Sequence, residues 1–217
     1  MKLALIGATG NVGKTILNEA LYRGHEVTAI ARDPQKLDIT NNKLTVKAVD
    51  VFDVDSLAAI LTGHDAVISA YNSGWANPNI YADFISGSEA IQKAVKQAGV
   101  KRLLVVGGAG SLEIAPGVQL VDSPDFPVAY KPGASAARDY LNILSKENEL
   151  DWTFLSPAIN MHPDAHGEPT RKFRLGTDQP VFDEKGVNYI LIEDLAVAII
   201  NEIENNQFIK RRFTVGY

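Results

Sequence analysis

The chain of 217 residues is long enough for one α/β domain and short for two, so we expect a single domain over residues 1–217. Its formal net charge of -5 disfavours a duplex-binding surface, and its lack of cysteine excludes disulfides, a thiolate nucleophile and cysteine-ligated zinc. Hydrophobic residues make up 46% of the chain without forming a bilayer-spanning stretch, so we expect a cytoplasmic protein that binds neither nucleic acid nor membrane.

The first half of the chain alternates short apolar runs with helical periodicity. Residues 3–6 form an apolar run, a glycine-rich loop follows, and residues 12–21 carry apolar side chains at helical spacing. We expect further strands at 26–31, 44–49, 65–70 and 102–106, and helices at 55–61 and 81–98. Strands that alternate with helices predict a doubly wound parallel sheet with helices on both faces, the Rossmann type of α/β fold.

The second half is less regular. Residues 107–133 show no clear period, and a loop of that length is usually functional or mobile. We expect a helix at 134–147, strands at 152–155, 187–192 and 213–215, and a helix at 193–203. Residues 1–156 would then form the Rossmann core and residues 157–217 a small C-terminal lobe on the substrate side. The basic run at 210–212 is expected in a solvated turn.

The loop Gly7-Ala8-Thr9-Gly10-Asn11-Val12-Gly13 lies between the first strand and the first helix. Glycines at this spacing permit a tight turn, the approach of a pyrophosphate to the backbone, and close packing of helix on strand. The N–H groups of the helix start then face the phosphates. We therefore predict a dinucleotide site, with a structural turn that binds no ligand as the alternative.

A second alternative is a nucleotide hydrolase. The run from Ala8 to Thr15 nearly matches a phosphate loop, with Lys14 on a phosphate and Thr15 on magnesium, although Ala8 stands where that motif has glycine. Such a site also needs a carboxylate at the end of an apolar strand. The predicted strands do not supply one, so we favour the dinucleotide site.

The end of the second predicted strand bears on the choice of cofactor. An acid there holds the ribose 2'-hydroxyl of NAD, whereas an arginine accommodates the 2'-phosphate of NADP. Both residue types are present, because the strand ends in Ala31-Arg32-Asp33. Arg32 comes first and Asp33-Pro34 is typical of a turn, so we expect NADP in preference to NAD.

Four motifs give the chain a resemblance to a known family: the glycine loop, Arg-Asp-Pro at 32–34, Ser-Pro-Ala at 156–158 and Ile-Glu-Asp-Leu-Ala at 192–196. Together they resemble the atypical short-chain dehydrogenase/reductase group, and in particular its small NAD(P)H-binding proteins related to flavin reductases and biliverdin reductase B. The similarity covers nearly the whole chain. With Gly7 of the loop, it implies cofactor contacts from Thr9, Gly10, Asn11, Val12, Arg32, Asp50, Val51, Ala70, Tyr71, Gly107, Gly108, Pro157 and Ala158.

The chain departs from the catalytic members of that family, in which a tyrosine stands four residues before a lysine. Tyr130 is followed at that spacing by Ala134, so the usual proton donor pair is missing, and Ser111 and Tyr130 are the remaining candidate proton donors. A planar flavin-like or quinone-like acceptor needs little acid catalysis, because its proton is drawn from solvent. We therefore expect an NAD(P)H-dependent oxidoreductase acting on such an acceptor, with Tyr71, Trp75 and Tyr130 as candidate ring contacts.

The absence of the tyrosine–lysine pair leaves a second function open. A non-catalytic protein that senses the redox state of NAD(P) would also lack the pair, so that role stays open. A homodimer stays open as well.

His162 and His166 are spaced as metal ligands on a helix, with Asp164 between them. Pro163 and Gly167 disfavour a helix there, so we expect no metal site.

Overall fold

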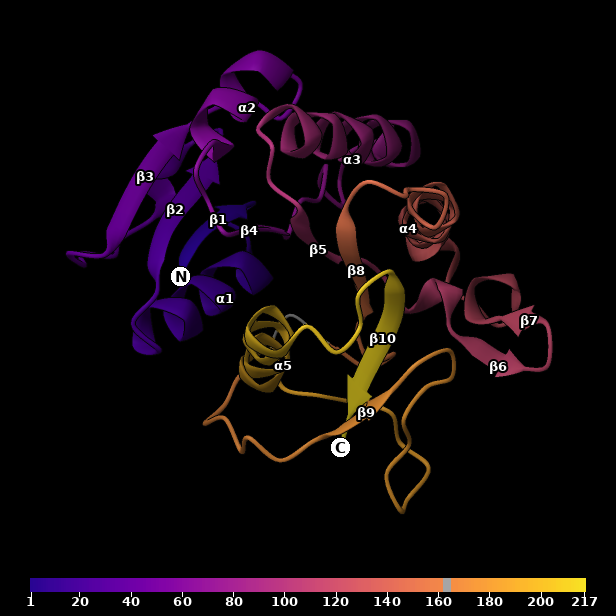
Figure 1. Ribbon diagram of the computed structural model, residues 1–217. Helices are drawn as coiled ribbons and strands as arrows, with labels where there is room; N and C mark the ends of the chain where they lie inside the picture. The colour runs from indigo at the N-terminus through magenta and orange to yellow at the C-terminus, as the bar shows by residue number, and fades with distance from the viewer. Residues whose placement is uncertain (162–164) are drawn as a thin grey trace.

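One mixed sheet runs through the molecule with its strands in the order β3-β2-β1-β4-β5-β8-β10-β9 (Figure 1). The computed structural model describes residues 1–161 and 165–217. Strand pairs are parallel, apart from β10 with β9, which is antiparallel. The strands are β1 (Lys2–Ile6), β2 (Glu26–Ala31), β3 (Leu44–Ala48), β4 (Ala66–Ser69), β5 (Arg102–Val106), β8 (Asp151–Ser156), β9 (Arg174–Gly176) and β10 (Arg211–Gly216).

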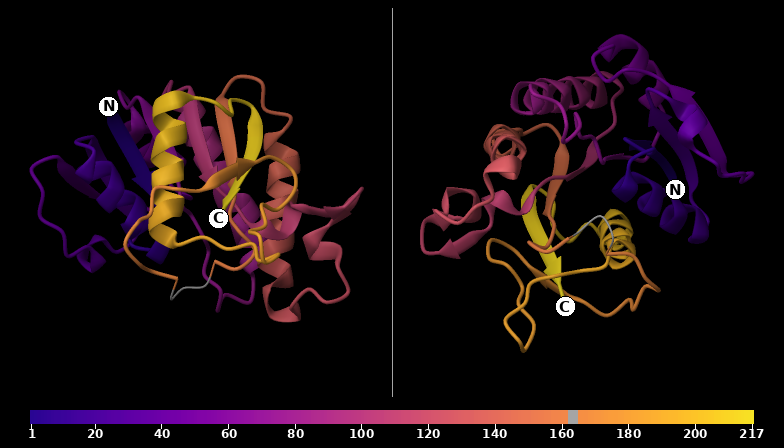
Figure 2. Two further views of the ribbon diagram at one scale, coloured as in Figure 1. Left: turned by 90° about the horizontal axis from the view of Figure 1, so that it is seen from below. Right: turned by 180° about the vertical axis from the view of Figure 1, so that it is seen from behind.

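Helices cover both faces of the sheet (Figures 1 and 2). One face is covered by α1 (Asn11–Tyr22) and α5 (Ile192–Asn205), the other by α2 (Val54–Leu61), α3 (Ile80–Gln97) and α4 (Lys131–Leu144). Strand β1 serves both layers because its side chains alternate: Leu3 and Leu5 are buried toward α1 and α5, and Ala4 and Ile6 toward α2 to α4. The predicted doubly wound α/β fold is therefore confirmed.

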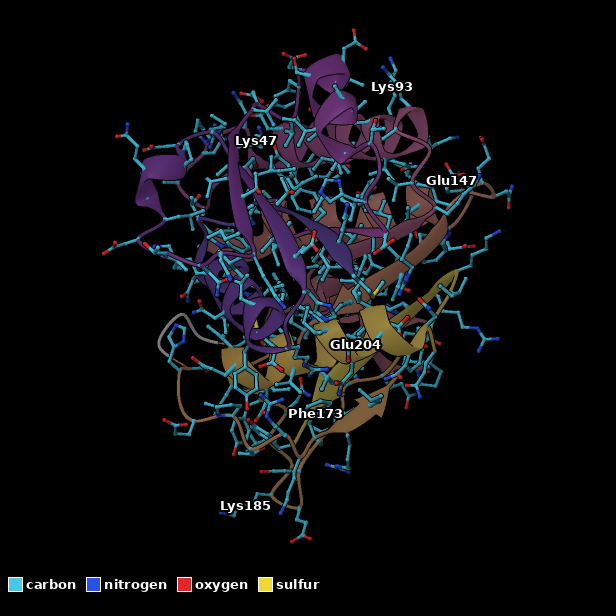
Figure 3. All side chains as sticks on the ribbon, turned by 60° about the vertical axis from the view of Figure 1, so that its left-hand side comes forward. Lys47, Lys93, Glu147, Phe173, Lys185 and Glu204 are labelled. Atoms are coloured by element: carbon cyan, nitrogen blue, oxygen red, sulfur yellow. The ribbon has the colours of Figure 1, made fainter. Side chains whose placement is uncertain are left out.

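The later elements differ from the sequence predictions. The strand expected at 187–192 is wrong, since only an isolated bridge joins Tyr189 to Asn160 within the described residues. Asn188 is buried there and binds the neighbouring backbone, accepting from the N–H of Ile159 at 2.6 Å and donating to Val181 O at 2.5 Å. Residues 177–191 instead form a loop, whose projecting end carries Lys185 (Figure 3).

Short elements also order the segment at 107–133. It contains 3-10 turns and the hairpin of β6 (Glu113–Ala115) and β7 (Val118–Gln119), which projects from the body of the molecule (Figure 2). The basic run is not a solvated turn throughout, because β10 begins at Arg211 and the side chain of Arg212 is mostly buried against Asp178 and Ser111. In the described part of the chain, the helices are too short or too polar to span a membrane.

A buried ion pair joins the sheet to α5 at the amino ends of the strands. Arg102, the first residue of β5, places Nη2 at 2.7 Å from Glu202 Oε1, and both side chains are almost fully buried. The guanidinium also donates to Thr153 Oγ1 at 2.8 Å. Glu202 accepts the N–H groups of Gln207 and Phe208. Burial lowers the pKa of Arg102, while the charge of Glu202 opposes that shift.

Candidate functional site

The glycine loop lies where the direction of winding changes. From β1 the chain adds β2 and β3 on one side, then returns to β4 on the other side of β1, which makes the carboxyl ends of β1 and β4 a switch point. Gly7 follows β1 with a φ of +79°, and a Cβ there would lie 2.4 Å from Ala70 O. A Cβ on Gly13 would lie 2.1 Å from Gly7 O. At both positions the loop packs so closely on neighbouring backbone atoms that only glycine fits.

Gly10 differs from its two neighbours in the motif. A Cβ on Gly10 would meet only Gly7 O, at 3.4 Å, and the residue is exposed. It is the N-cap of α1, whose first turn runs Asn11-Val12-Gly13-Lys14 without a carboxylate. The positive end of the helix dipole thus stands beside an open backbone position, which fits an anionic diphosphate.

Other predicted contact residues gather at the same edge of the sheet. Arg32 follows β2 and is exposed, and no carboxylate within the described ranges pairs with it. Burial raises the pKa of Tyr71, Asp83 and Asp50 reinforce that shift, and Arg32 opposes it, so Arg32 and Asp50 lie within electrostatic reach of the phenol. Asp50 Oδ1 already accepts the N–H of Phe52 at 3.1 Å, which shapes the turn after β3.

Two predicted contact residues use their side chains for packing. Val51 is buried in the core under α2. Tyr71 stacks on Phe84 with ring centroids 6.1 Å apart, and its hydroxyl donates to Asp83 O at 2.9 Å. Its ring also fills the space beside Gly87, where an added Cβ would lie 2.4 Å from the hydroxyl. The ring of Tyr71 is therefore fixed against α3.

The ends of β5 and β8 complete this edge. A Cβ on Gly107 would lie 1.9 Å from the ring of Phe154, so glycine is needed for packing whatever binds nearby. A Cβ on Gly108 would lie 3.3 Å from that of Ala137. Pro157 and Ala158 follow β8 and are buried, with Ala158 in the core beneath α1 and α5. Because β5 and β8 pair in parallel, these four residues lie at neighbouring strand ends.

The two candidate proton donors have different surroundings. Ser111 is 1% exposed, accepts from Arg212 Nη1 at 3.1 Å, and has its Oγ 3.4 Å from that of Ser156. Tyr130 is 55% exposed and makes an edge contact with Trp75 at a centroid distance of 5.4 Å. The hydroxyl of Ser111 is thus buried among protein groups, whereas the ring of Tyr130 is open to solvent.

Trp75 and Tyr130 are exposed and in contact with each other, and we call them the aromatic pair. Trp75 follows β4 and is 60% exposed, and its ring lies against the first turn of α4, where a Cβ on Gly133 would be 2.8 Å from it. Tyr130 immediately precedes α4. Exposed aromatic rings fixed by packing on one side offer flat surfaces to a planar ligand.

Sequence reasoning missed a contact between distant segments. His166 lies with Nδ1 2.6 Å from Glu193 Oε1 and with Nε2 2.9 Å from Asn11 Oδ1. The sequence predicts no metal site at His162, Asp164 and His166, and two of these residues, His162 and Asp164, lie outside the described residues. Among the residues that are described, no three acidic or histidine side chains gather as metal ligands would.

The two residues that the nucleotide hydrolase alternative needs, Lys14 and Thr15, both lie in α1. The Thr15 hydroxyl donates to Asn11 O at 3.2 Å, one turn earlier, as threonine commonly does inside a helix. Lys14 lies exposed in the same turn. Both side chains therefore behave as ordinary residues of the first helical turns.

Comparison with known proteins identifies relatives over the full length of the chain. Residues 7–204 match the NAD(P)H-binding protein family. The uncharacterized protein YwnB of Bacillus subtilis is 37% identical over 217 residues, covering 99% of this chain and 98% of YwnB. SP1627 of Streptococcus pneumoniae, a proposed NADH-flavin reductase, is 39% identical with a TM-score of 0.86 over 100% of this chain and 99% of that one. A proposed epimerase from Bacteroides thetaiotaomicron is 47% identical with a TM-score of 0.92, covering 100% and 96% of the two chains.

Proposed function

The chain belongs to the NAD(P)H-binding protein family, and from this premise we propose that it is a reductase that uses NADPH to reduce a small planar acceptor, flavin-like or quinone-like. The observation that carries the proposal is the glycine loop at the switch point, with Gly10 open beside the start of α1. A bound diphosphate requires backbone N–H groups and an unobstructed approach to them. The similarity to the proposed NADH-flavin reductase SP1627 supports the class of acceptor.

Arg32 supports the choice of NADPH over NADH. It stands at the end of β2, where the adenosine ribose lies in this type of fold, and its guanidinium is exposed. Asp33, the competing acid, lies 3.4 Å from Lys36 Nζ. An arginine that projects from this strand end suits the two negative charges of a 2'-phosphate.

The surroundings of the candidate donors support a planar acceptor. The bound cofactor supplies a hydride, and a conjugated ring that accepts it takes its proton from solvent. The chain then has to hold and orient the ring, a role for which the exposed aromatic pair is suited. Ser111, whose hydroxyl is buried against Arg212 and Ser156, is not needed as an acid in this reaction.

Steady-state oxidation of NADPH with flavin, quinone and small carbonyl acceptors tests the function. We expect turnover with the first two and little with the carbonyls, and a Trp75→Ala variant should raise the KM for the acceptor about tenfold by removing one face of its site. Tyr22→Ala, which removes an exposed aromatic residue from the far end of α1, is the matched control and should leave that KM unchanged. If the protein bound NADPH but turned over no acceptor, the result would contradict the reductase function and favour the redox-sensing role.

Arg32→Ala tests the cofactor preference. Loss of a charge-assisted contact with the 2'-phosphate should weaken NADPH binding about 10- to 100-fold and change NADH binding by less than about twofold. Both dissociation constants are measured by titration of the reduced cofactor's fluorescence. Lys93→Ala, which removes an exposed cation from α3, should leave the ratio of the two constants unchanged. An unchanged ratio in Arg32→Ala itself would show that the preference lies elsewhere.

A further inference from the structure

The imidazole of His166 bridges the glycine loop and the start of α5. Nδ1 lies 2.6 Å from Glu193 Oε1 and Nε2 lies 2.9 Å from Asn11 Oδ1. Each ring nitrogen therefore faces one side-chain oxygen, Nδ1 that of Glu193 and Nε2 that of Asn11. Asn11 is the first residue of α1, and the loop it ends is the one to which we assign the diphosphate.

The fold holds the segment that carries His166 on both sides. Ala165 O accepts the N–H of Ile192 at 2.9 Å, and Glu193 Oε2 accepts the N–H of Gly167 at 3.1 Å. Further along, the carboxylate of Asp194 is fully buried and accepts from the Thr170 hydroxyl at 2.8 Å. Arg171 pairs with both oxygens of Glu19 on α1 at 2.9 Å. These contacts fix residues 165–171 to α1 and α5, so the position of His166 is set by the fold.

The side chain of Asn11 has a competing use at this position. Asparagine oxygens near a helix start readily accept backbone N–H groups of the first turn. Those same N–H groups are the ones that a diphosphate needs. An Asn11 oxygen that turned inward would therefore compete with the cofactor, and in the structure that oxygen is held by His166.

We propose that His166, oriented by Glu193, is a cofactor-positioning residue that holds the Asn11 amide oxygen away from the N–H groups at the start of α1. This inference rests on the proposed function, because it assigns those N–H groups to the diphosphate. His166 acts through Asn11 and need not touch the cofactor. The sequence separates the three residues by 155 and 27 positions along the chain, and the fold brings them together.

Two isosteric replacements separate this role from loop anchoring. In His166→Asn the new amide reaches Glu193 but not Asn11, whereas in His166→Gln the longer amide reaches Asn11 at the former Nε2 position. We expect His166→Asn to raise the dissociation constant of NADPH about 5- to 10-fold and His166→Gln to stay within about twofold of the native protein. If His166 only anchored its own segment to Glu193, the order of the two variants would be reversed.

A double-mutant cycle with Asn11→Ala completes the test. Without the Asn11 side chain, no oxygen competes for the first-turn N–H groups, so adding His166→Asn to Asn11→Ala should change NADPH binding by less than about twofold. An effect of His166→Asn that persists in full on the Asn11→Ala background would overturn the inference, as would native affinity in His166→Asn alone. If the native protein bound neither NADPH nor NADH, the proposed function and this inference would both fail.

Discussion

Replacing Glu202 with alanine should lower the free energy of unfolding by about 3–5 kcal/mol, because it leaves the buried guanidinium of Arg102 without its counter-charge. The variant also leaves the N–H groups of Gln207 and Phe208 without their acceptor. For a chain of this length, the expected loss corresponds to a fall of about 6–20 °C in Tm. Urea unfolding followed by circular dichroism measures the loss of free energy, and thermal unfolding measures the fall in Tm.

Glu204→Ala is the matched control for Glu202→Ala. Glu204 lies on the same helix, α5, and pairs with Arg23 at the same distance of 2.7 Å, but a third of its side chain is exposed (Figure 3). Glu204 also lies 2.9 Å from His25 Nε2, but solvent reaches its carboxylate and screens both interactions, so this variant should lose no more than about 1 kcal/mol. Equal losses in the two variants would mean that burial does not decide the contribution of the Arg102 pair. The Arg102–Glu202 pair lies at the amino ends of the strands, away from the proposed cofactor site. The folded Glu202→Ala protein should therefore bind NADPH with native affinity.

Gly13→Ala should destabilise the fold by about 3 kcal/mol, because its methyl group would lie 2.1 Å from the backbone oxygen of Gly7. Neither group is the end of a flexible side chain, so α1 must move away from β1 to make room. That movement disturbs the packing of Ile16 and Leu17 on the sheet. The measurement is again urea unfolding, with the native protein alongside.

Gly10→Ala is the control for this effect and tests the site at the same time. The added methyl group meets its nearest protein atom at 3.4 Å and the backbone φ of -72° suits alanine, so unfolding should change by no more than about 1 kcal/mol. NADPH binding should nevertheless weaken at least about tenfold, because the methyl group stands where the diphosphate approaches. Native affinity in Gly10→Ala would place the diphosphate away from this residue.

The sequence was sufficient for the part of the fold that has local signals. Three local signals predict the strand, loop and helix that meet at the switch point. They are the unbroken apolar run from Leu3 to Ile6, the three glycines at fixed spacing, and the helical period after Val12. The resemblance implies that Arg32 and Asp50 both contact the cofactor, and the parallel pairing of β2 with β3 places them at one edge of the sheet. The signals for the strand, the loop and the helix come from residues close together in the chain.

The remaining features depend on contacts that no local pattern records. Strand β9 has three residues with polar neighbours, and it forms because β10 offers an edge to pair with. Burial does alternate at 187–192, since Asn188 and Ile190 are buried and Val187 and Tyr189 are exposed, but the described residues pair with this segment only in the isolated bridge at Asn160. The sequence spacing relates His166 only to His162, because the partners of His166 in the fold, Asn11 and Glu193, are brought to it by the packing of α1 beside α5.

The closure of the glycine loop by its own backbone has a consequence for binding kinetics. Gly7 and Gly13 each approach backbone oxygens so closely that the loop has little freedom to adopt another shape. A preorganised loop loses little conformational entropy when a ligand arrives, so affinity is not diminished by an ordering step. Association of the dinucleotide should therefore proceed as a single second-order phase, whose observed rate rises linearly with ligand concentration and reaches no plateau set by loop rearrangement.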